Sequence, residues 1–138
     1  MSLKELAIQL SGYIQDGYSL DVLPIQENGN GEISVLQITV EGFDELPIFV
    51  TSTDEQILCV TNLFQKEEVK QELLDDLNDT LLQLSVNVPL SSLGKIDGQY
   101  VLFGAMSVNT LLDNIAHELV VQSENALEAL EALEEFLN

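Results

Sequence analysis

Apolar residues recur every three or four positions between residues 108 and 137, and this is the strongest hydrophobic pattern in the chain. The spacing is typical of an amphipathic helix, because it puts the apolar side chains along one side. The apolar positions are Val108, Leu111, Leu112, Ile115, Ala116, Leu119, Val120, Ala126, Leu127, Leu130, Leu133, Phe136 and Leu137. The other side carries Glu118, Glu124, Glu128, Glu131, Glu134 and Glu135. We expect a long C-terminal helix that docks onto another surface.

The apolar pattern lapses between Gln122 and Asn125. Asn125 and Glu128 form an Asn-x-x-Glu signal that can start a helix, because such side chains cap free backbone groups. The helix is therefore expected either to run on or to kink or restart near Ser123. Residues 108–121 follow an apolar strand and should pack on a sheet, whereas residues 126–137 are expected to be the freer part.

Two further helices are predicted upstream, each with apolar residues at helical spacing. The first covers residues 2–14 and starts with a capping box formed by Ser2 and Glu5. Gly17 can supply its left-handed cap, since glycine adopts positive φ without strain. The second helix covers residues 66–84.

The remaining patterned segments are typical of β-strands, because they are rich in β-branched residues or alternate between apolar and polar positions. They are residues 20–25, 32–40, 46–53, 56–64, 86–90 and 99–106. Turn signals lie at Asn28-Gly29-Asn30-Gly31 and at Asp97-Gly98. Strands joined by short turns pair in antiparallel fashion. The sequence predicts one α+β domain over residues 1–138, with helices packed on an antiparallel sheet in the order α-β-β-β-β-α-β-β-α.

The composition is strongly acidic, with 24 carboxylates against four lysines and a formal net charge of −20. Hydrophobic residues make up 46% of the chain, which is enough for a core and argues against disorder. Binding to nucleic acid is not expected, because no cationic patch is available to replace counterions. The charge favours basic partners, or it serves solubility alone.

The only cysteine, Cys59, cannot form an intramolecular disulfide, which suits a reducing compartment. The N-terminal residues lack the apolar segment of a signal peptide. No apolar run approaches the roughly 20 residues that span a bilayer. We expect a cytoplasmic protein without membrane insertion, in which Cys59 is a small buried hydrophobe and His117 a structural or surface residue.

A set of carboxylates on the predicted 66–84 helix could bind a divalent cation, since hard cations take several oxygen ligands. These are Glu72, Asp75, Asp76 and Asp79. Carboxylates that stand parallel on one helix face rarely converge, so a solvated face is favoured. His117 and Cys59 form no recognisable catalytic motif, and no nucleophile elbow or phosphate-binding loop is present. We expect no catalytic residues, cofactor or metal.

Four segments carry a resemblance to a known family: residues 46–49, 88–95, 99–105 and 112–119, with Ser107 between the last two. They resemble the YjfI-type family of bacterial proteins of unknown function. The resemblance implies little chemistry, because the family has no established activity. Genes of this type resemble neighbours of membrane-stress genes of the phage-shock-protein-A type, which hints at a link to envelope stress.

The order of elements is similar to the secretion-chaperone-like fold. That resemblance implies a protein that binds extended partner segments and dimerises, although a fold does not fix a function. We therefore expect a non-enzymatic interaction protein, chaperone-like or an adaptor, that uses an apolar surface ringed by carboxylates. The expected contact residues are Leu127, Leu130, Leu133, Phe136, Glu128, Glu131 and Glu134. The alternatives are a small-ligand- or cation-binding protein or enzyme that uses an acidic face, and a self-associating homodimer.

Overall fold

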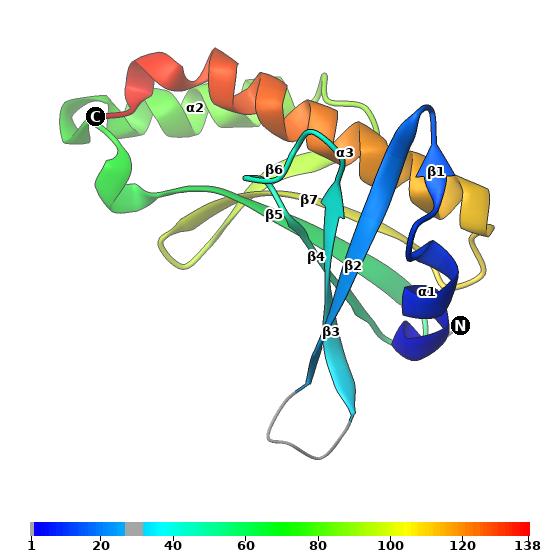
Figure 1. The fold of residues 1–138 in the computed structure, drawn as a ribbon. Coiled ribbons are helices and arrows are strands. Elements are labelled where there is room, and N and C mark those ends of the chain that lie inside the picture. The colour runs from blue at the N-terminus through cyan, green and yellow to red at the C-terminus, as the bar shows by residue number, and fades with distance from the viewer. Residues whose placement is uncertain (1, 27–31) are drawn as a thin grey trace.

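The computed structural model describes residues 2–26 and 32–138 and shows helices packed on a seven-stranded sheet (Figure 1). In chain order the α-helices and strands are α1 Leu3–Leu10, β1 Ile14–Gln15, β2 Tyr18–Gln26, β3 Ile33–Val40, β4 Ile48–Ser52, β5 Gln56–Gln65, α2 Leu74–Ser85, β6 Ser92–Ile96, β7 Gln99–Ser107 and α3 Leu112–Ala132. Single 3₁₀ turns occupy Lys66–Glu68, Gln71–Leu73 and Glu134–Phe136. The predicted α+β class with a long C-terminal helix is confirmed.

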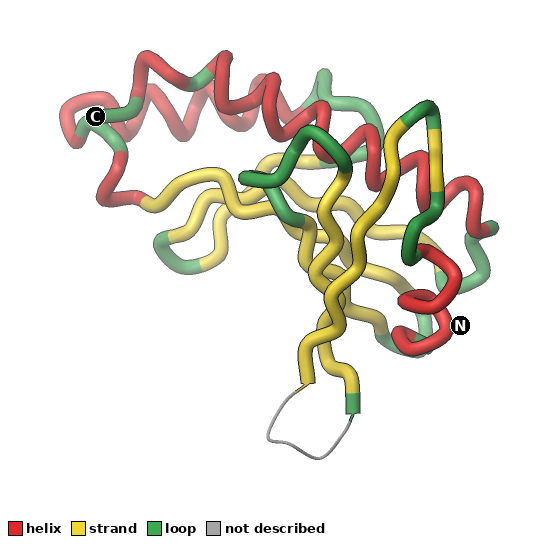
Figure 2. The backbone as a smooth tube through the Cα atoms, in the orientation of Figure 1, coloured by secondary structure: helices red, strands yellow, loops and turns green. Residues whose placement is uncertain are grey.

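Every pair of neighbouring strands in the described sheet is antiparallel, in the order β1-β2-β3-β4-β5-β7-β6. The strands β2 and β3 form a long hairpin that projects away from α2 and α3 (Figure 2). The turn predicted at Asn28–Gly31 lies outside the described residues. The central strand β5 pairs with β4 on one side and with β7 on the other, and so joins the hairpins into one sheet.

The first helix starts as predicted and ends earlier than predicted. The Ser2 side-chain oxygen accepts a hydrogen bond from the Glu5 N–H at 3.1 Å, which caps the helix. The chain leaves the helix after Leu10 and forms the short strand β1, which the sequence did not reveal. Gly17, with a φ of 86°, shapes the turn between β1 and β2 together with Asp16, instead of capping α1.

The region before β7 also differs from the prediction. Two 3₁₀ turns precede α2, so the predicted 66–84 helix is regular only from Leu74 onward. Residues 86–90 form no strand, because Val86 continues the helical turn of α2 and the Asn87 N–H donates to the Leu84 carbonyl at 2.9 Å. Leu90 ends the segment with a left-handed φ of 62°. The strand of this region is instead β6, over residues for which no strand was predicted. The predicted Asp97–Gly98 turn is confirmed and joins β6 to β7.

The core lies on one face of the sheet, between the strands and the helices. The main cluster joins α1 and the first half of α3 to β2, β3, β4, β5 and β7. A second cluster lies around α2 and the end of α3, where the rings of Phe64 and Tyr100 stack with centroids 5.1 Å apart. A small third cluster links Leu46, Leu102 and Ala126. Residues far apart in the sequence are thus held by apolar burial on a single side of the sheet.

The last helix, α3, is continuous through Ser123, so of the two alternatives left open by the sequence the helix runs on. Of the polar residues that interrupt the stripe, Gln122, Ser123 and Asn125 are buried, whereas Glu124 is exposed. The Gln122 side-chain amide donates to the Thr61 hydroxyl at 3.0 Å and to the Cys59 carbonyl at 3.3 Å. These bonds satisfy polar groups that burial would otherwise leave unpaired. The gap in the apolar pattern therefore includes the residue through which α3 forms hydrogen bonds to β5.

The second half of α3 is not free, which corrects another expectation. Its buried residues include Ala126, Ala129 and Leu133, and Phe136 follows in the terminal 3₁₀ turn. The Asn125 side chain donates to the Pro89 carbonyl at 2.8 Å and ties the helix to the segment before β6. None of the helices in the described part of the chain combines the length and apolar character needed to cross a bilayer.

Candidate functional site

The seven residues expected to contact a partner lie in different surroundings. Leu133 is 0% exposed and Phe136 is buried, whereas Leu127 is 44% exposed and Leu130 is partly buried. The three glutamates, Glu128, Glu131 and Glu134, are all exposed. The structure therefore divides the expected set into two core residues and a group that remains at the surface.

Leu133 and Phe136 belong to the second core cluster. They pack with Phe64, Val69 and Leu77, residues from β5, from the segment that follows it and from α2. The Phe136 carbonyl accepts a hydrogen bond from the Lys70 N–H at 2.8 Å, which closes this end of the molecule. In this fold neither side chain is available to a partner, because both cover the chain's own apolar groups.

Leu127 and Leu130 line an open hollow of about 510 Å³. Its other walls come from the loop between β3 and β4 and from the end of β5. The loop contributes Gly42, Phe43, Asp44, Glu45 and Leu46, and β5 contributes Asn62 and Leu63. Figure 2 shows this loop rising from the sheet toward α3. We call the hollow the α3 hollow.

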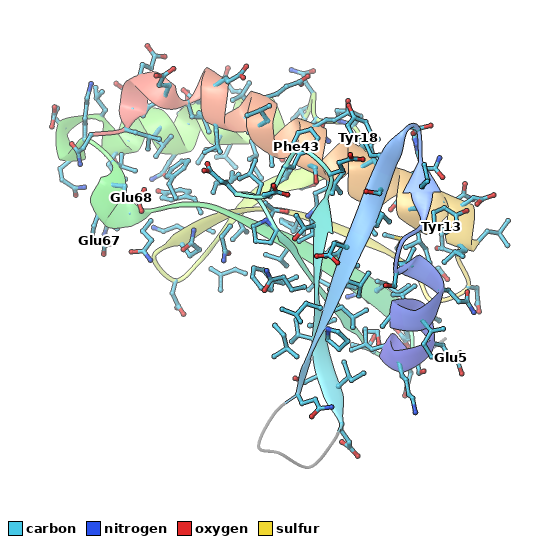
Figure 3. The ribbon with its side chains drawn as sticks, in the orientation of Figure 1. Glu5, Tyr13, Tyr18, Phe43, Glu67 and Glu68 are labelled. Atoms are coloured by element: carbon cyan, nitrogen blue, oxygen red, sulfur yellow. The ribbon has the colours of Figure 1, made fainter. Side chains whose placement is uncertain are left out.

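The ring of Phe43 is held in place at the base of the loop. Its centroid lies 5.9 Å from that of Tyr18, in a tilted arrangement typical of aromatic pairs (Figure 3). The Phe43 N–H also donates to the Val40 carbonyl at 2.9 Å, and the Leu46 N–H to the Phe43 carbonyl at 3.0 Å. The loop is thus a set of short turns that presents one wall of the α3 hollow in a defined position.

The α3 hollow has a mixed lining, in which five apolar side chains stand beside Asn62 and two carboxylates. Asp44 and Glu45 are exposed on its loop side. On the helix side, Glu131 follows Leu127 by four residues and so stands on the same face. None of the described residues that line the hollow is a lysine. Such a site can take an apolar side chain flanked by cationic groups.

Glu128 lies elsewhere. It borders a smaller hollow of about 200 Å³ between α2 and α3, together with Leu84, Pro89 and Asn125. A wider hollow of about 790 Å³ opens between the start of α1 and the ends of β2 and β3, but polar side chains such as Ser2, Gln26 and Ser34 make up most of its lining. Glu128 is the one ionisable residue among those that line the smaller hollow, whereas Lys4 and Glu32 line the wider one.

The carboxylates considered for a cation do not form a cage. Glu72 lies in a 3₁₀ turn, and Asp75, Asp76 and Asp79 lie exposed on α2. The Asp79 carboxylate accepts a hydrogen bond from the Gln83 side chain at 2.8 Å. In residues 2–26 and 32–138, no group of three or more histidine, cysteine or acidic side chains is arranged to hold a metal ion.

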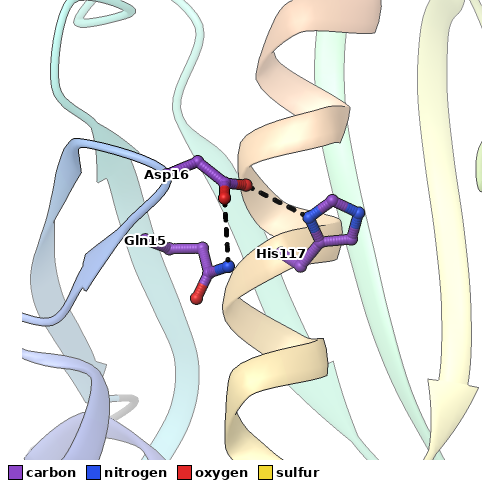
Figure 4. Close-up of polar contacts among 3 residues, drawn as sticks. All are labelled: Gln15, Asp16 and His117. Atoms are coloured by element: carbon purple, nitrogen blue, oxygen red, sulfur yellow. Dashed lines mark hydrogen bonds and ion pairs between the residues drawn. The ribbon is translucent and has the colours of Figure 1, made fainter.

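The lone histidine joins two elements at the surface. His117 Nδ1 lies 3.2 Å from Asp16 Oδ2, and the Gln15 side chain donates to Asp16 Oδ1 at 3.5 Å (Figure 4). The contact connects α3 to the β1–β2 turn. Both partners of this ion pair are about half exposed, so the pair contributes little to stability. The pKa of the adjacent Glu118 carboxyl is raised, because the effect of its burial outweighs the opposite effect of His117.

The lone cysteine is buried, as expected. Burial, and then the charge of Glu118, raise the pKa of the Cys59 thiol to about 12. A thiol with such a pKa stays protonated at neutral pH and is a poor nucleophile. Cys59 therefore serves as a small core residue on β5, and its backbone carbonyl is the part that meets α3.

Taken together, the fold and the α3 hollow describe an α+β protein with a surface hollow suited to a side chain of a partner. The chain belongs to the DUF2170 family of uncharacterized proteins conserved in bacteria, which it matches over residues 3–137. It is 29% identical over 107 residues to the uncharacterized protein YjfI of Escherichia coli, strains K12 and O157:H7. That match covers 75% of this chain and 79% of the relative. The resemblance to the YjfI-type family is confirmed.

A solved structure shares the fold. A chain of the crystal structure of the ExsC-ExsE complex matches with a TM-score of 0.56 at 12% identity. The match covers 96% of this chain and 96% of the other. Similarity to the secretion-chaperone-like fold, inferred from the order of elements, is thereby confirmed for the architecture. At 12% identity, the structural similarity is evidence for the fold alone.

Proposed function

We propose that this protein is a non-enzymatic interaction module that binds a partner protein through the α3 hollow. The observation that carries the proposal is the exposed Leu127, which lines a hollow together with other apolar side chains and with the carboxylates Asp44 and Glu45. Apolar pockets that are open at the surface of a small domain are typical of protein interfaces, where one anchoring side chain fills the pocket. The contact set is Leu127, Leu130, Phe43 and Leu46, with Asp44, Glu45, Glu131 and Glu134 around them.

The charge of the molecule supports a partner with basic groups beside its apolar anchor. With 24 carboxylates and four lysines, the surface attracts cations and repels acidic proteins. Complementary charge mainly raises the association rate and selects among partners. A chain with the same fold occurs in the ExsC-ExsE complex, which supports a protein rather than a small molecule as the ligand.

The narrower form of the proposal is a chaperone-like or adaptor protein in the envelope-stress response, acting in the cytoplasm. It rests on the family resemblance and on the shared architecture. The proposal includes a homodimer only if the second copy contributes residues that bind the partner protein. Each of these points depends on the identity of the partner, which a capture experiment supplies.

Leu127→Glu tests the α3 hollow without touching the core. The substitution puts a charge into the apolar hollow at an exposed helix position, so folding should change by no more than about 0.5 kcal/mol. In a quantitative pull-down from a lysate of the source bacterium, we expect partners recovered by the wild type to fall about tenfold or more with Leu127→Glu.

Leu82→Glu is the matched control, because Leu82 is an exposed leucine on another helix, α2. This control should recover the same partners as the wild type. Equal recovery by the wild type and by Leu127→Glu, with both proteins folded by circular dichroism, would refute binding at the α3 hollow. So would the absence of any partner specific to the wild type.

A further inference from the structure

The helices cover only one face of the sheet. In Figure 1, α2 and α3 lie above the strands and α1 lies beside one end, while no helix of the described chain lies below β5 and β7. Successive side chains of a strand point to opposite faces, so the neighbours of core residues must face the uncovered side. Phe49 lies between the buried Ile48 and Val50, and Leu58 and Val60 flank the buried Cys59.

The uncovered side carries many apolar residues, among polar ones such as Gln37 and Thr39. We call it the open sheet face and define it by one apolar set on β2, β3, β4, β5 and β7. The set is Leu23, Ile25, Val35, Phe49, Leu58, Val60, Val101, Phe103 and Ala105. None of these residues belongs to the three core clusters. The solvent side of an antiparallel sheet is normally polar, so this composition requires an explanation.

The register aligns four of these apolar residues into a row across the strands, with Gln37 and Ser92 as the polar members of the row. Leu23 pairs with Gln37, Gln37 with Phe49, Phe49 with Val60, Val60 with Phe103, and Phe103 with Ser92. Six neighbouring strands span about 24 Å at the usual spacing. Leu23 is 56% exposed and Phe103 is 36% exposed, so the row is accessible at both ends.

Phe103 is held against the sheet at a glycine. A Cβ atom built on Gly94 would lie 2.9 Å from Cε1 of the Phe103 ring and 3.9 Å from the Val101 side chain. The ring therefore lies across the β6 backbone and covers Val101, which is fully buried. The absence of a side chain at Gly94 leaves room for the Phe103 ring in this position.

A helix fits this surface better than an added strand. The face offers side chains, whereas the backbone groups of its strands are paired within the sheet, so the occupant must satisfy its own backbone hydrogen bonds. The sheet edges are poor templates for an extra strand. On β6 the Leu93 N–H is bonded to the Ser85 hydroxyl at 2.9 Å, and β2 carries Pro24, which has no N–H.

The charges around the open sheet face select the kind of helix. Asp21 is the only charged side chain that the described strands place on this face, and the turns at its margins carry Asp54, Glu55 and Asp97. Two cations lie near the Asp97 margin: Lys66, whose N–H donates to the Gly98 carbonyl, and Lys95, whose Nζ lies over the Tyr100 ring. A second copy of this chain would bring another net charge of −20, whereas a cationic partner would be attracted.

We propose that the open sheet face is a docking surface for an amphipathic helix of a partner protein, with lysine or arginine on the flanks of its apolar side. Bound there, the helix adds a third layer to the fold and covers the row from Leu23 to Phe103. The inference rests on the protein-binding role proposed above but not on the α3 hollow, which is a separate surface.

The test uses the full chain and a synthetic amphipathic helix made of leucine and lysine, about 18 residues or roughly 27 Å long. A peptide of the same pattern with glutamate in place of lysine is the charge control. Binding is measured by calorimetry with the wild type and with the double variant Val60→Thr plus Phe103→Thr. Threonine keeps the preference for strand while removing apolar area. We expect the double variant to bind the lysine peptide about tenfold more weakly.

Two control proteins separate this surface from others. Leu82→Thr plus Val86→Thr removes exposed apolar groups near α2, and Leu127→Glu changes the α3 hollow. Both should bind the lysine peptide within about threefold of the wild type. If the Val60 and Phe103 pair fails to fold, Leu23→Thr makes the same test at a more exposed position. The glutamate peptide should not bind.

Three results would overturn the inference. The lysine peptide does not bind, or it binds the wild type and the Val60→Thr plus Phe103→Thr variant equally well, or its binding is weakened only by Leu127→Glu. Light scattering that shows a dimer dissociated by the Val60 and Phe103 pair would also overturn it, because a second copy would then be the occupant. The pull-down with Leu127→Glu tests binding at the α3 hollow independently. A negative result for one of the two surfaces therefore does not decide the result for the other.

Discussion

Leu127 and Leu133 are chemically identical residues near the same end of α3, and their surroundings differ completely. Leu127 projects into an open hollow, whereas Leu133 is enclosed by residues from β5 and α2. Burial stabilises the fold in proportion to the apolar area that is removed from water. One leucine therefore contributes mainly to stability, and the other is available for binding.

Truncation of the two leucines should separate these roles. Leu133→Ala removes a fully buried side chain and should lower the free energy of unfolding by about 2–5 kcal/mol. Leu127→Ala should lower it by less than about 1 kcal/mol, because much of that side chain is already in water. Urea denaturation followed by circular dichroism measures both. Equal losses would mean that the end of α3 is not docked as described.

At the scale of elements, α3 is held to the sheet by polar as well as apolar contacts. Gln122 reaches Thr61 and Cys59 on β5, and Asn125 reaches Pro89 in the segment before β6. Gly104 on β7 has no side chain, which leaves room for Gln122 and for the segment before β6 to approach the strand closely. A Cβ atom there would lie 3.1 Å from the Leu90 carbonyl oxygen and 3.3 Å from the Gln122 side-chain oxygen. The bonds of Gln122 and Asn125 favour this position of α3 along the sheet, because a shifted helix would leave their buried side chains unpaired.

Removal of the Gln122 amide should be costly for its size. Gln122→Ala leaves the buried Thr61 hydroxyl without this donor and opens a cavity, so unfolding should become easier by about 2–3 kcal/mol. Gln9→Ala, at an exposed position of α1, is the matched control and should change stability by less than about 0.5 kcal/mol. Thermal and urea unfolding of the two variants measure the difference. A loss no larger than that of the control would argue against the buried bonds.

At the scale of the whole molecule, charge and shape are both asymmetric. The net charge of −20 belongs to a small domain, and the α3 hollow and the open sheet face are two places where apolar residues remain open. Like charges on a compact chain repel one another and oppose folding, although they also keep the protein soluble. The two open surfaces therefore lie in a negative field, which favours basic partners at both.

Added salt should stabilise the protein by screening this repulsion. The Debye length falls from about 30 Å to about 8 Å between low and physiological ionic strength. We expect the Tm to rise by roughly 5 °C over that range. Sodium, potassium and tetramethylammonium chlorides should act alike at equal ionic strength, as measured by calorimetry. A much larger rise with millimolar calcium, magnesium or manganese would instead support the cation-binding alternative.

The sequence alone determined the features that depend on local pattern. Helical spacing of apolar residues identified the amphipathic character of α3, and alternation with turn signals indicated an antiparallel sheet. The Ser2 cap and the Asp97–Gly98 turn followed from short-range chemistry, because the groups involved are neighbours in the chain. The acidic character of the surface followed from composition.

Only the tertiary structure decided which apolar residues are covered. The stripe on α3 specifies a face but not what lies against it, so it could not distinguish Leu127 from Leu133. The opposite wall of the α3 hollow comes from the β3–β4 loop, far away in the sequence. Gln122 looked like a break in a pattern, and it is a buried contact because β5 supplies its partners. The open sheet face likewise exists because all three α-helices pack on one side, an outcome of the competition among distant segments for the same apolar surface.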